Sequence, residues 1–158
     1  MTKTKPTRIV SLDYGLARIG VALSDERKII ASPLMTIQAE KKSEKTAVKV
    51  VHELQQHQDK LLYTLEEIVI GLPLLLSGKS GHLADEVKHF IELLKKLTTV
   101  PIVTWDERLT TVQAEKALRE GSMNRRQRSK VVDTVSAAIL LQGYLDHRVI
   151  KSARMLDA

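Results

Sequence analysis

Asp13 stands where the surrounding sequence predicts a buried, apolar side chain. Alternation along residues 8–14 places Asp13 at the end of a first strand, on the face that Ile9 and Ser11 share. Charged side chains are rarely buried without a partner. We therefore expect Asp13 to face a covered surface on which its charge is compensated.

Glu107 ends a second strand pattern in the same way. From Pro101 onward, alternation groups Glu107 with Val103 and Trp105 on one face of the strand. The pattern predicts a second carboxylate at a strand terminus, on a face that is otherwise apolar.

Asp133 belongs to a helical pattern. Helical spacing lines it up with Ala137, Leu140 and Tyr144, so an ionisable group ends an apolar stripe. A divalent cation would compensate carboxylates that converge from two strand ends and a helix, and Mg²⁺ and Mn²⁺ favour such oxygen ligands. The three acids together predict a metal-dependent site for cutting phosphodiesters, with Asp13 as a ligand that bridges two ions.

Each acid taken alone also has an ordinary structural explanation. Asp13 could simply end a strand, and Glu107 could pair with the neighbouring Arg108. Asp133 could favour the first turn of a helix, because a negative charge there complements the helix dipole. The occurrence of all three in one fold favours the metal site.

Positive charge gathers just before Asp133. The chain has a formal net charge of +6, and four basic residues follow the helix-breaking segment 121–124: Arg125, Arg126, Arg128 and Lys130. This cluster could clamp a nucleic-acid backbone or form a solvated loop. Aromatic residues make up only 3% of the chain, so no platform for stacking bases is evident. Backbone contacts would then dominate substrate binding.

Four further residues could contact a substrate phosphate. Arg18 and Arg108 could hold the scissile phosphate or balance the acids. Thr111 lies at the start of a predicted helix and could also touch phosphate. Lys79 lies in a segment, residues 77–80, whose glycine spacing does not fit a nucleotide-binding P-loop, although Lys79 could still reach a phosphate.

Length and composition limit the class of protein. A chain of 158 residues favours one domain, which we expect over 1–148, followed by a tail over 149–158. The absence of cysteine excludes disulfides, thiolate catalysis and cysteine zinc sites. The sequence contains neither a signal-peptide core nor an apolar run that could span a membrane, so we expect a cytoplasmic protein without a membrane partner.

The hydrophobic patterns predict an α/β fold with a five-stranded mixed sheet. The early connections are short, so three antiparallel strands are expected first, followed by two parallel strands linked through helices. The expected strands cover residues 8–14, 18–25, 29–37, 67–71 and 101–107. The expected helices cover residues 43–59, 80–97, 110–120 and 128–145. Ser43 is the expected N-cap of the first helix.

Several segments of the chain, taken in their order along the sequence, resemble the YqgF/RuvX family. The matching segments are 12–15 with 18–22, then 71–74, then 105–111, and finally Asp133 with 137–138. Proteins of this family are described as Holliday junction resolvases and as nucleases that trim precursor 16S ribosomal RNA. The resemblance implies a ribonuclease H-like fold, an acidic triad of Asp13, Glu107 and Asp133, and a divalent metal.

One loop departs from the family pattern. The family commonly carries asparagine and acidic residues after its Gly-Leu-Pro-Leu segment, whereas residues 75–81 read Leu-Leu-Ser-Gly-Lys-Ser-Gly here. The acidic triad is intact, so the departure concerns how this loop grips substrate.

The sequence therefore predicts a metal-dependent endonuclease that acts on structured nucleic acid. Precursor ribosomal RNA is the first expected substrate and branched DNA the second. One alternative is a non-catalytic nucleic-acid-binding factor in transcription or ribosome assembly. Another is an actin-like ATPase or sugar kinase, for which the chain lacks a second lobe. A monomer would suffice for trimming RNA, whereas symmetric cutting of a junction would need a homodimer.

Overall fold

A five-stranded mixed sheet forms the centre of the molecule, in the order β3-β2-β1-β4-β5. The computed structural model describes residues 4–73, 81–106 and 125–156, with the backbone alone over 125–132. The strands are β1 (Thr7–Tyr14), β2 (Arg18–Ser24), β3 (Ala31–Gln38), β4 (Thr64–Leu72) and β5 (Ile102–Asp106). Strands β1, β2 and β3 pair antiparallel, and β4 and β5 continue the sheet in parallel from β1. The predicted five strands and their directions are confirmed.

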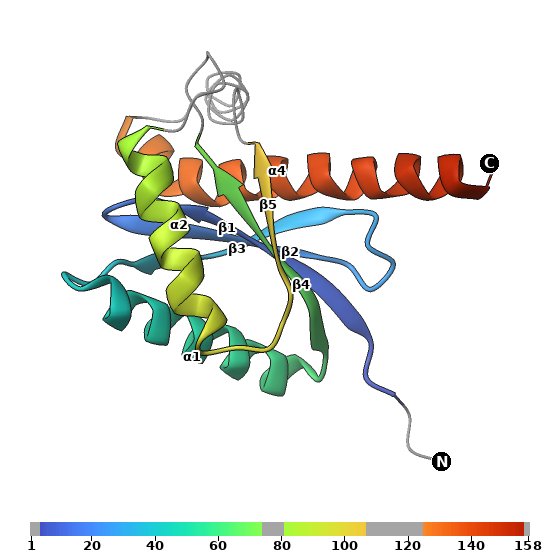
Figure 1. Ribbon diagram of the computed structural model, residues 1–158, viewed down its shortest axis with the longest axis horizontal. Helices are drawn as coiled ribbons and strands as arrows, with labels where there is room; N and C mark the ends of the chain where they lie inside the picture. Colours follow the sequence, from blue (N-terminus) through green and yellow to red (C-terminus); the bar gives the residue numbers. More distant parts are fainter. Residues whose placement is uncertain (1–3, 74–80, 107–124, 157–158) are drawn as a thin grey trace.

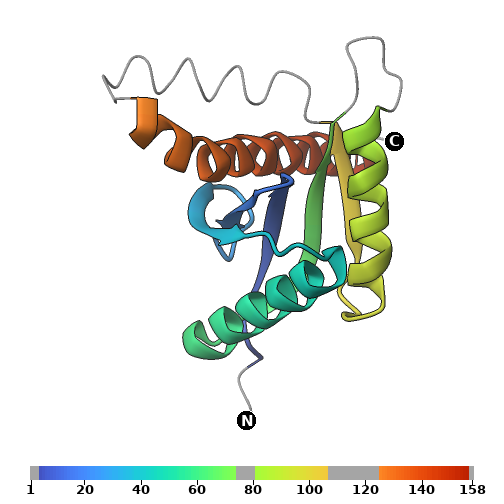
Figure 2. The same cartoon turned by 90° about the vertical axis from the view of Figure 1, so that its left-hand side faces the viewer.

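Helices cover both faces of this sheet (Figure 1). Helices α1 (Ser43–Leu61) and α2 (His82–Lys95) pack on one face, and α4 (Arg125–Leu156) packs on the other. Figure 2 shows α1 and α4 on opposite sides of the strands. The sheet is therefore the middle layer of three, as expected when helices connect parallel strands.

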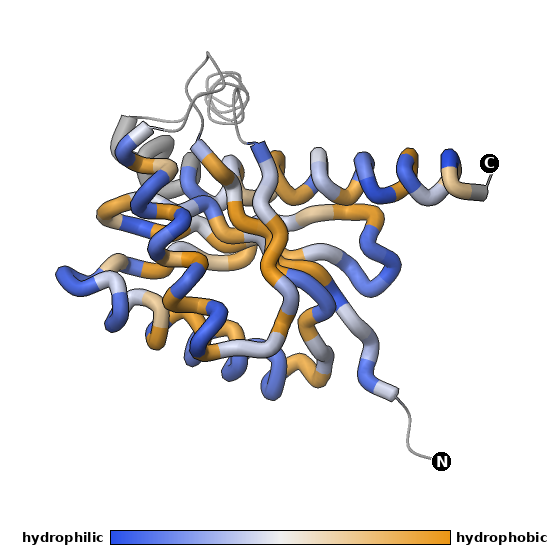
Figure 3. Tube along the Cα trace, in the orientation of Figure 1, coloured by the Kyte–Doolittle hydropathy of each residue, from blue (hydrophilic) through white to orange (hydrophobic). Residues whose placement is uncertain are grey.

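The two faces of β1 belong to two separate hydrophobic cores. Val10 and Leu12 belong to the core shared with α1 and α2, whereas Ile9 belongs to the core shared with Leu140 and Leu141 of α4. Figure 3 shows apolar residues concentrated in these central strands. Burying each such side chain contributes about 1.5–3 kcal/mol. The alternation predicted from the sequence is confirmed, and it assigns odd-numbered residues of β1 to the α4 side.

Helix α4 is longer than predicted, because it runs through residues 125–156 instead of 128–145. The apolar stripe stops near Leu145, where the helix leaves the sheet. The helix continues because residues 146–156 contain no glycine or proline. Despite its 32 residues, α4, like the other described helices, has no apolar stretch long enough to cross a bilayer.

The predicted start of α1 needs a correction. Lys42, not Ser43, is the N-cap, and its side chain makes no capping hydrogen bond. Ser43 is the first residue of the helix itself. Helix α2 begins after Gly81, two residues later than predicted. The predicted helix over 110–120 lies outside the described residues.

Two buried tyrosines predict a loss of stability at alkaline pH. Burial raises the pKa of Tyr63 and of Tyr144 to about 12. The Tyr144 hydroxyl also donates to the Glu67 carboxylate at 2.9 Å, which further disfavours its ionisation. In the unfolded chain these tyrosines lose their protons at about pH 10. The free energy of unfolding is therefore unaffected by them below that pH and falls between about pH 10 and 12.

Thermal unfolding followed by circular dichroism across this range measures the effect. The melting temperature of Tyr144→Phe should fall less at alkaline pH than that of the unsubstituted protein, because phenylalanine does not ionise. A melting temperature that declines identically in both proteins would contradict the assignment.

Candidate active site

Asp13 lies at the carboxyl end of the central strand and points toward α4. It is half-buried, and its backbone pairs with Gly20 of β2. Directly paired residues of neighbouring strands project from the same face of a sheet. A Cβ at Gly20 would meet Asp133 of α4, so the Asp13 side chain projects toward the same helix. The predicted orientation of Asp13 is confirmed.

Gly20 allows α4 to approach the sheet closely at Asp133. A Cβ at Gly20 would lie 3.0 Å from the Asp133 Cβ and far inside van der Waals contact with the Asp133 carbonyl oxygen. Only glycine permits an approach of this kind. Paired Cα atoms lie about 5 Å apart in an antiparallel ladder. Asp13, opposite Gly20, and Asp133, above Gly20, are therefore neighbours.

A buried hydrogen bond fixes how α4 lies on the sheet beside these two acids. The Ser11 hydroxyl donates to the backbone oxygen of Ala137 at 2.7 Å. Ser11 precedes Asp13 by two residues on the same face of β1, and Ala137 follows Asp133 by about one helical turn. The contact thus holds the two acids at matching levels along strand and helix.

Arg18 balances the charge of Asp133. Its Nε atom donates to Asp133 Oδ2 at 2.7 Å, and the two side chains are 36% and 22% exposed. The sequence left open whether Arg18 would balance an acid or bind a phosphate. This contact supports the balancing role and orients the carboxylate, while phosphate binding by Arg18 stays a prediction.

Glu107 lies outside the described residues, although the strand that leads to it is described. Val103 and Trp105 of β5 pack in the core on the α4 side, as alternation predicted. Three residues that were predicted to contact phosphate also lie outside the described residues: Lys79, Arg108 and Thr111.

The basic cluster lies in a helix and not in a loop. The backbones of residues 125–130 form the first turns of α4. The loop alternative is therefore wrong. The cluster comprises Arg125, Arg126, Arg128 and Lys130, all on the helix that carries Asp133.

The chemistry of this site fits a divalent metal. Carboxylate oxygens are the preferred ligands of Mg²⁺ and Mn²⁺. Asp13 and Asp133 could offer such oxygens from β1 and α4, which lie side by side at Gly20. The described part of the chain contains no group of three or more metal-ligating side chains, and the third predicted ligand, Glu107, lies outside that part.

Gly20 is a residue of the site that was not among the predicted site residues. A glycine inside a strand pattern is a signal for close backbone approach, and this signal could have identified it. No local pattern indicated that the segment approaching Gly20 would be the one that carries Asp133.

Comparisons with known proteins agree with this architecture. Residues 7–147 match the family described as "RuvX: Holliday junction resolvase". A protein of Protochlamydia amoebophila named "Putative pre-16S rRNA nuclease" is 60% identical over 146 residues, which cover 92% of this chain and 97% of the relative. A protein of the same name from Desulforudis audaxviator is 42% identical over 147 residues, which cover 93% and 98%.

The fold also matches solved structures. Thermus thermophilus RuvC in complex with a Holliday junction substrate superposes with a TM-score of 0.53 at 13% identity, covering 90% of this chain and 96% of RuvC. The fowlpox virus Holliday junction resolvase gives a TM-score of 0.51 at 12% identity, with 89% and 99% covered. These likenesses confirm the ribonuclease H-like fold. The family match and the two similar relatives show that this chain belongs to the RuvX family.

Proposed function

We propose that this protein is a metal-dependent endonuclease that processes the 5′ end of precursor 16S ribosomal RNA. The observation that carries the proposal is that Asp13 and Asp133 both lie beside Gly20, at the carboxyl end of the central strand. Two relatives that this chain covers almost completely are named as nucleases of pre-16S rRNA, which supports the choice of substrate. Such processing would occur in the cytoplasm, with a single copy of the chain sufficing for each cut.

The side chains of this site would bind the metal ions and hold one another in a fixed orientation. Asp13, Asp133 and Glu107 would hold Mg²⁺ or Mn²⁺, which when bound activates water and stabilises the charge that develops on the phosphate. Arg18 keeps the Asp133 carboxylate in a fixed orientation through its 2.7 Å contact. In the reaction, a water oxygen bonds to phosphorus and the bond from phosphorus to the 3′ oxygen breaks. A proton passes to that oxygen, which leaves a 3′-hydroxyl and a 5′-phosphate.

The first turns of α4 suit a nucleic-acid backbone. The cluster from Arg125 to Lys130 precedes Asp133 by three to eight residues on one continuous helix. At 1.5 Å per residue, these positions lie within about 12 Å of Asp133 along the helix axis. We propose that the cluster, together with Lys79, Arg108 and Thr111, holds phosphates on either side of the scissile bond.

A side-by-side cleavage assay tests this function. A precursor 16S leader, a four-way DNA junction and single strands are incubated with Mg²⁺, with Mn²⁺ or with a chelator. We expect the leader to be cut with either metal, no cutting with chelator, and recovery when metal is restored. Binding without cutting under every metal condition would contradict the nuclease proposal.

The family description favours resolution of Holliday junctions as a second candidate function. That function would need two active sites and hence a homodimer. Preferential, symmetric cutting of the junction in the same assay, by a protein that sediments as a dimer, would assign it.

A further inference from the structure

A pocket of about 540 Å³ lies between β5 and the C-terminal half of α4. Its volume falls within the range of about 300–1,000 Å³ that is typical of small-ligand pockets. On α4 its lining begins at Tyr144, about three helical turns after Asp133, so the pocket is separate from the Asp133 carboxylate. Figure 1 shows that this half of α4 extends beyond β5. Six lining residues matter here: Glu67, Trp105, Tyr144, His147, Arg148 and Lys151.

Three rings meet in this pocket, one from β5 and two from α4. The ring centroid of Trp105 lies 5.7 Å from that of Tyr144, in an edge-on arrangement, and 5.1 Å from that of His147. Tyr144 is buried, Trp105 is half-buried and His147 is exposed. Tyr144 thus packs against the indole of Trp105, and the indole remains partly accessible to solvent. A held, accessible indole is a surface on which a planar ligand can stack.

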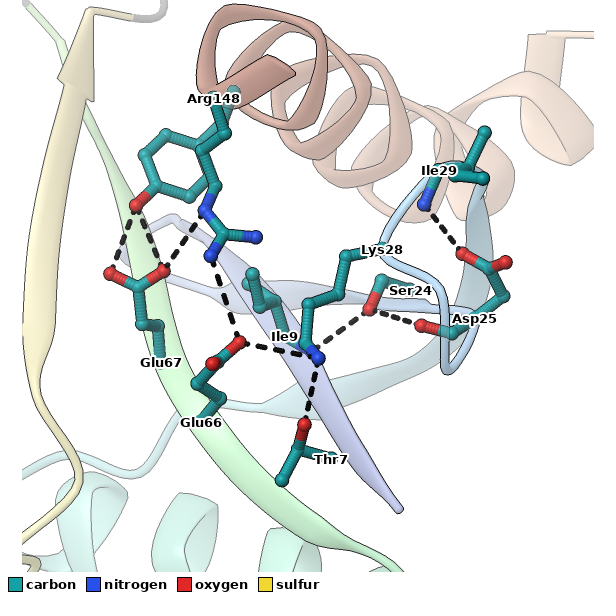
Figure 4. Close-up of polar contacts among 10 residues, drawn as sticks. Thr7, Ile9, Ser24, Asp25, Lys28, Ile29, Glu66, Glu67 and Arg148 are labelled. Carbon is teal, nitrogen blue, oxygen red and sulfur yellow. Dashed lines mark hydrogen bonds and ion pairs between the residues drawn. The ribbon is translucent and has the colours of Figure 1, made fainter. Parts of the chain in front are cut away.

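A network of polar contacts holds the charged wall of the pocket (Figure 4). Arg148 lies 3.6 Å from Glu67 and 3.8 Å from Glu66, and the Tyr144 hydroxyl donates to Glu67 at 2.9 Å. Lys28 of the β2–β3 hairpin lies 3.5 Å from Glu66. These contacts fix Arg148 and the Tyr144 ring relative to the sheet.

Lys151 adds positive charge at the open side of the pocket. It is exposed and lines both this pocket and the adjoining pocket that contains Arg154. The pocket therefore combines accessible aromatic rings with cations, and these are the two groups that bind a single-stranded nucleotide through its base and its phosphate.

We propose that this pocket binds an unpaired nucleotide of the substrate, its base stacked on Trp105 and His147 and its phosphate at Lys151. The nature of the ligand rests on the proposed function. The pocket lies on the strand that leads toward Glu107, so the bound nucleotide would flank the cleavage site. The sequence alone showed no such cluster of rings, because the rings come from residues 105 and 144–147 and meet only when α4 packs on the sheet.

Trp105 is the only tryptophan of the chain, so its fluorescence reports on this pocket alone. The unsubstituted protein, with chelator present, is titrated with a dye-labelled single-stranded RNA and with an abasic strand of equal length and charge. Anisotropy of the dye measures saturation independently. We expect the RNA at saturation to quench the tryptophan and the abasic strand to leave it nearly unchanged. Equal signals from the two strands, no quenching at saturation, or no binding of either strand would overturn the proposal.

Two substitutions separate stacking from charge. His147→Ala, at an exposed position, should weaken binding of the RNA at least about fivefold and leave the abasic strand unaffected. Lys151→Ala should weaken both strands and lower the slope of log affinity against log salt by about 0.7. Lys60→Ala is the matched control, because Lys60 is exposed at the end of α1 on the other face of the sheet.

The outcomes also distinguish this inference from the proposed function. If the protein cuts precursor RNA but His147→Ala binds both strands as the unsubstituted protein does, the pocket is not a nucleotide site. If base-dependent quenching occurs and no substrate is ever cut, the pocket stands and the nuclease proposal fails.

Discussion

Replacing Asp13 with asparagine is expected to reduce cleavage of precursor RNA at least about a hundredfold while the protein stays folded. Loss of a residue that merely supports a metal ligand costs about 10–100-fold, and loss of a ligand itself should cost no less. The fold should tolerate the change, because asparagine has nearly the same shape and volume as aspartate.

Single-turnover cleavage of the precursor 16S leader at saturating Mg²⁺ measures this effect, and the melting temperature reports folding. Asp59→Asn is the matched control, because Asp59 is exposed on α1 and its remaining oxygen can still accept the hydrogen bond from Gln55. The control should cut normally. If Asp13→Asn cuts as fast as the control, Asp13 is not a metal ligand and the proposed mechanism is wrong.

Replacing Gly20 with alanine is expected to damage stability and activity together. The added Cβ would collide with the backbone carbonyl of Asp133, which cannot move without α4. Overpacking of this kind costs about 1–3 kcal/mol of the free energy of unfolding, and each kcal/mol lowers the melting temperature by roughly 2–4 °C in a chain of this size. Displacing α4 also separates Asp133 from Asp13, and a misplacement of about 1 Å can cost about a hundredfold in rate.

Gly143→Ala provides the control for the loss of a glycine. A Cβ at Gly143 would meet the Trp105 indole nitrogen at 3.5 Å, an ordinary contact, and alanine favours the helix by up to about 1 kcal/mol over glycine. Its melting temperature should be equal or higher. If Gly20→Ala melts and cuts as Gly143→Ala does, the close approach of α4 to β2 is not what brings the two acids together.

Much of the fold could be predicted from the sequence because its signals are local. Period-two alternation assigned Asp13 and Ile9 to one face of β1, and helical spacing placed Asp133 at the end of a buried stripe. Connection lengths separated the antiparallel strands from the parallel ones. Helix ends were less predictable: Lys42 is the N-cap of α1 although its side chain makes no capping hydrogen bond, so no capping residue marks that end in the sequence.

Local patterns identified which residues could do chemistry and which strands and helices carry them, since alternation and helical spacing depend only on near neighbours. Tertiary structure alone decided which of these residues meet. The contact of Arg18 with Asp133 spans 115 positions, and the rings of Trp105 and Tyr144 come together from separate elements. Both follow from the way α4 packs on the sheet, above Gly20 at one end and beside β5 at the other. No local pattern encodes such a packing, because it depends on the combined shape of surfaces that the chain forms only after its elements exist.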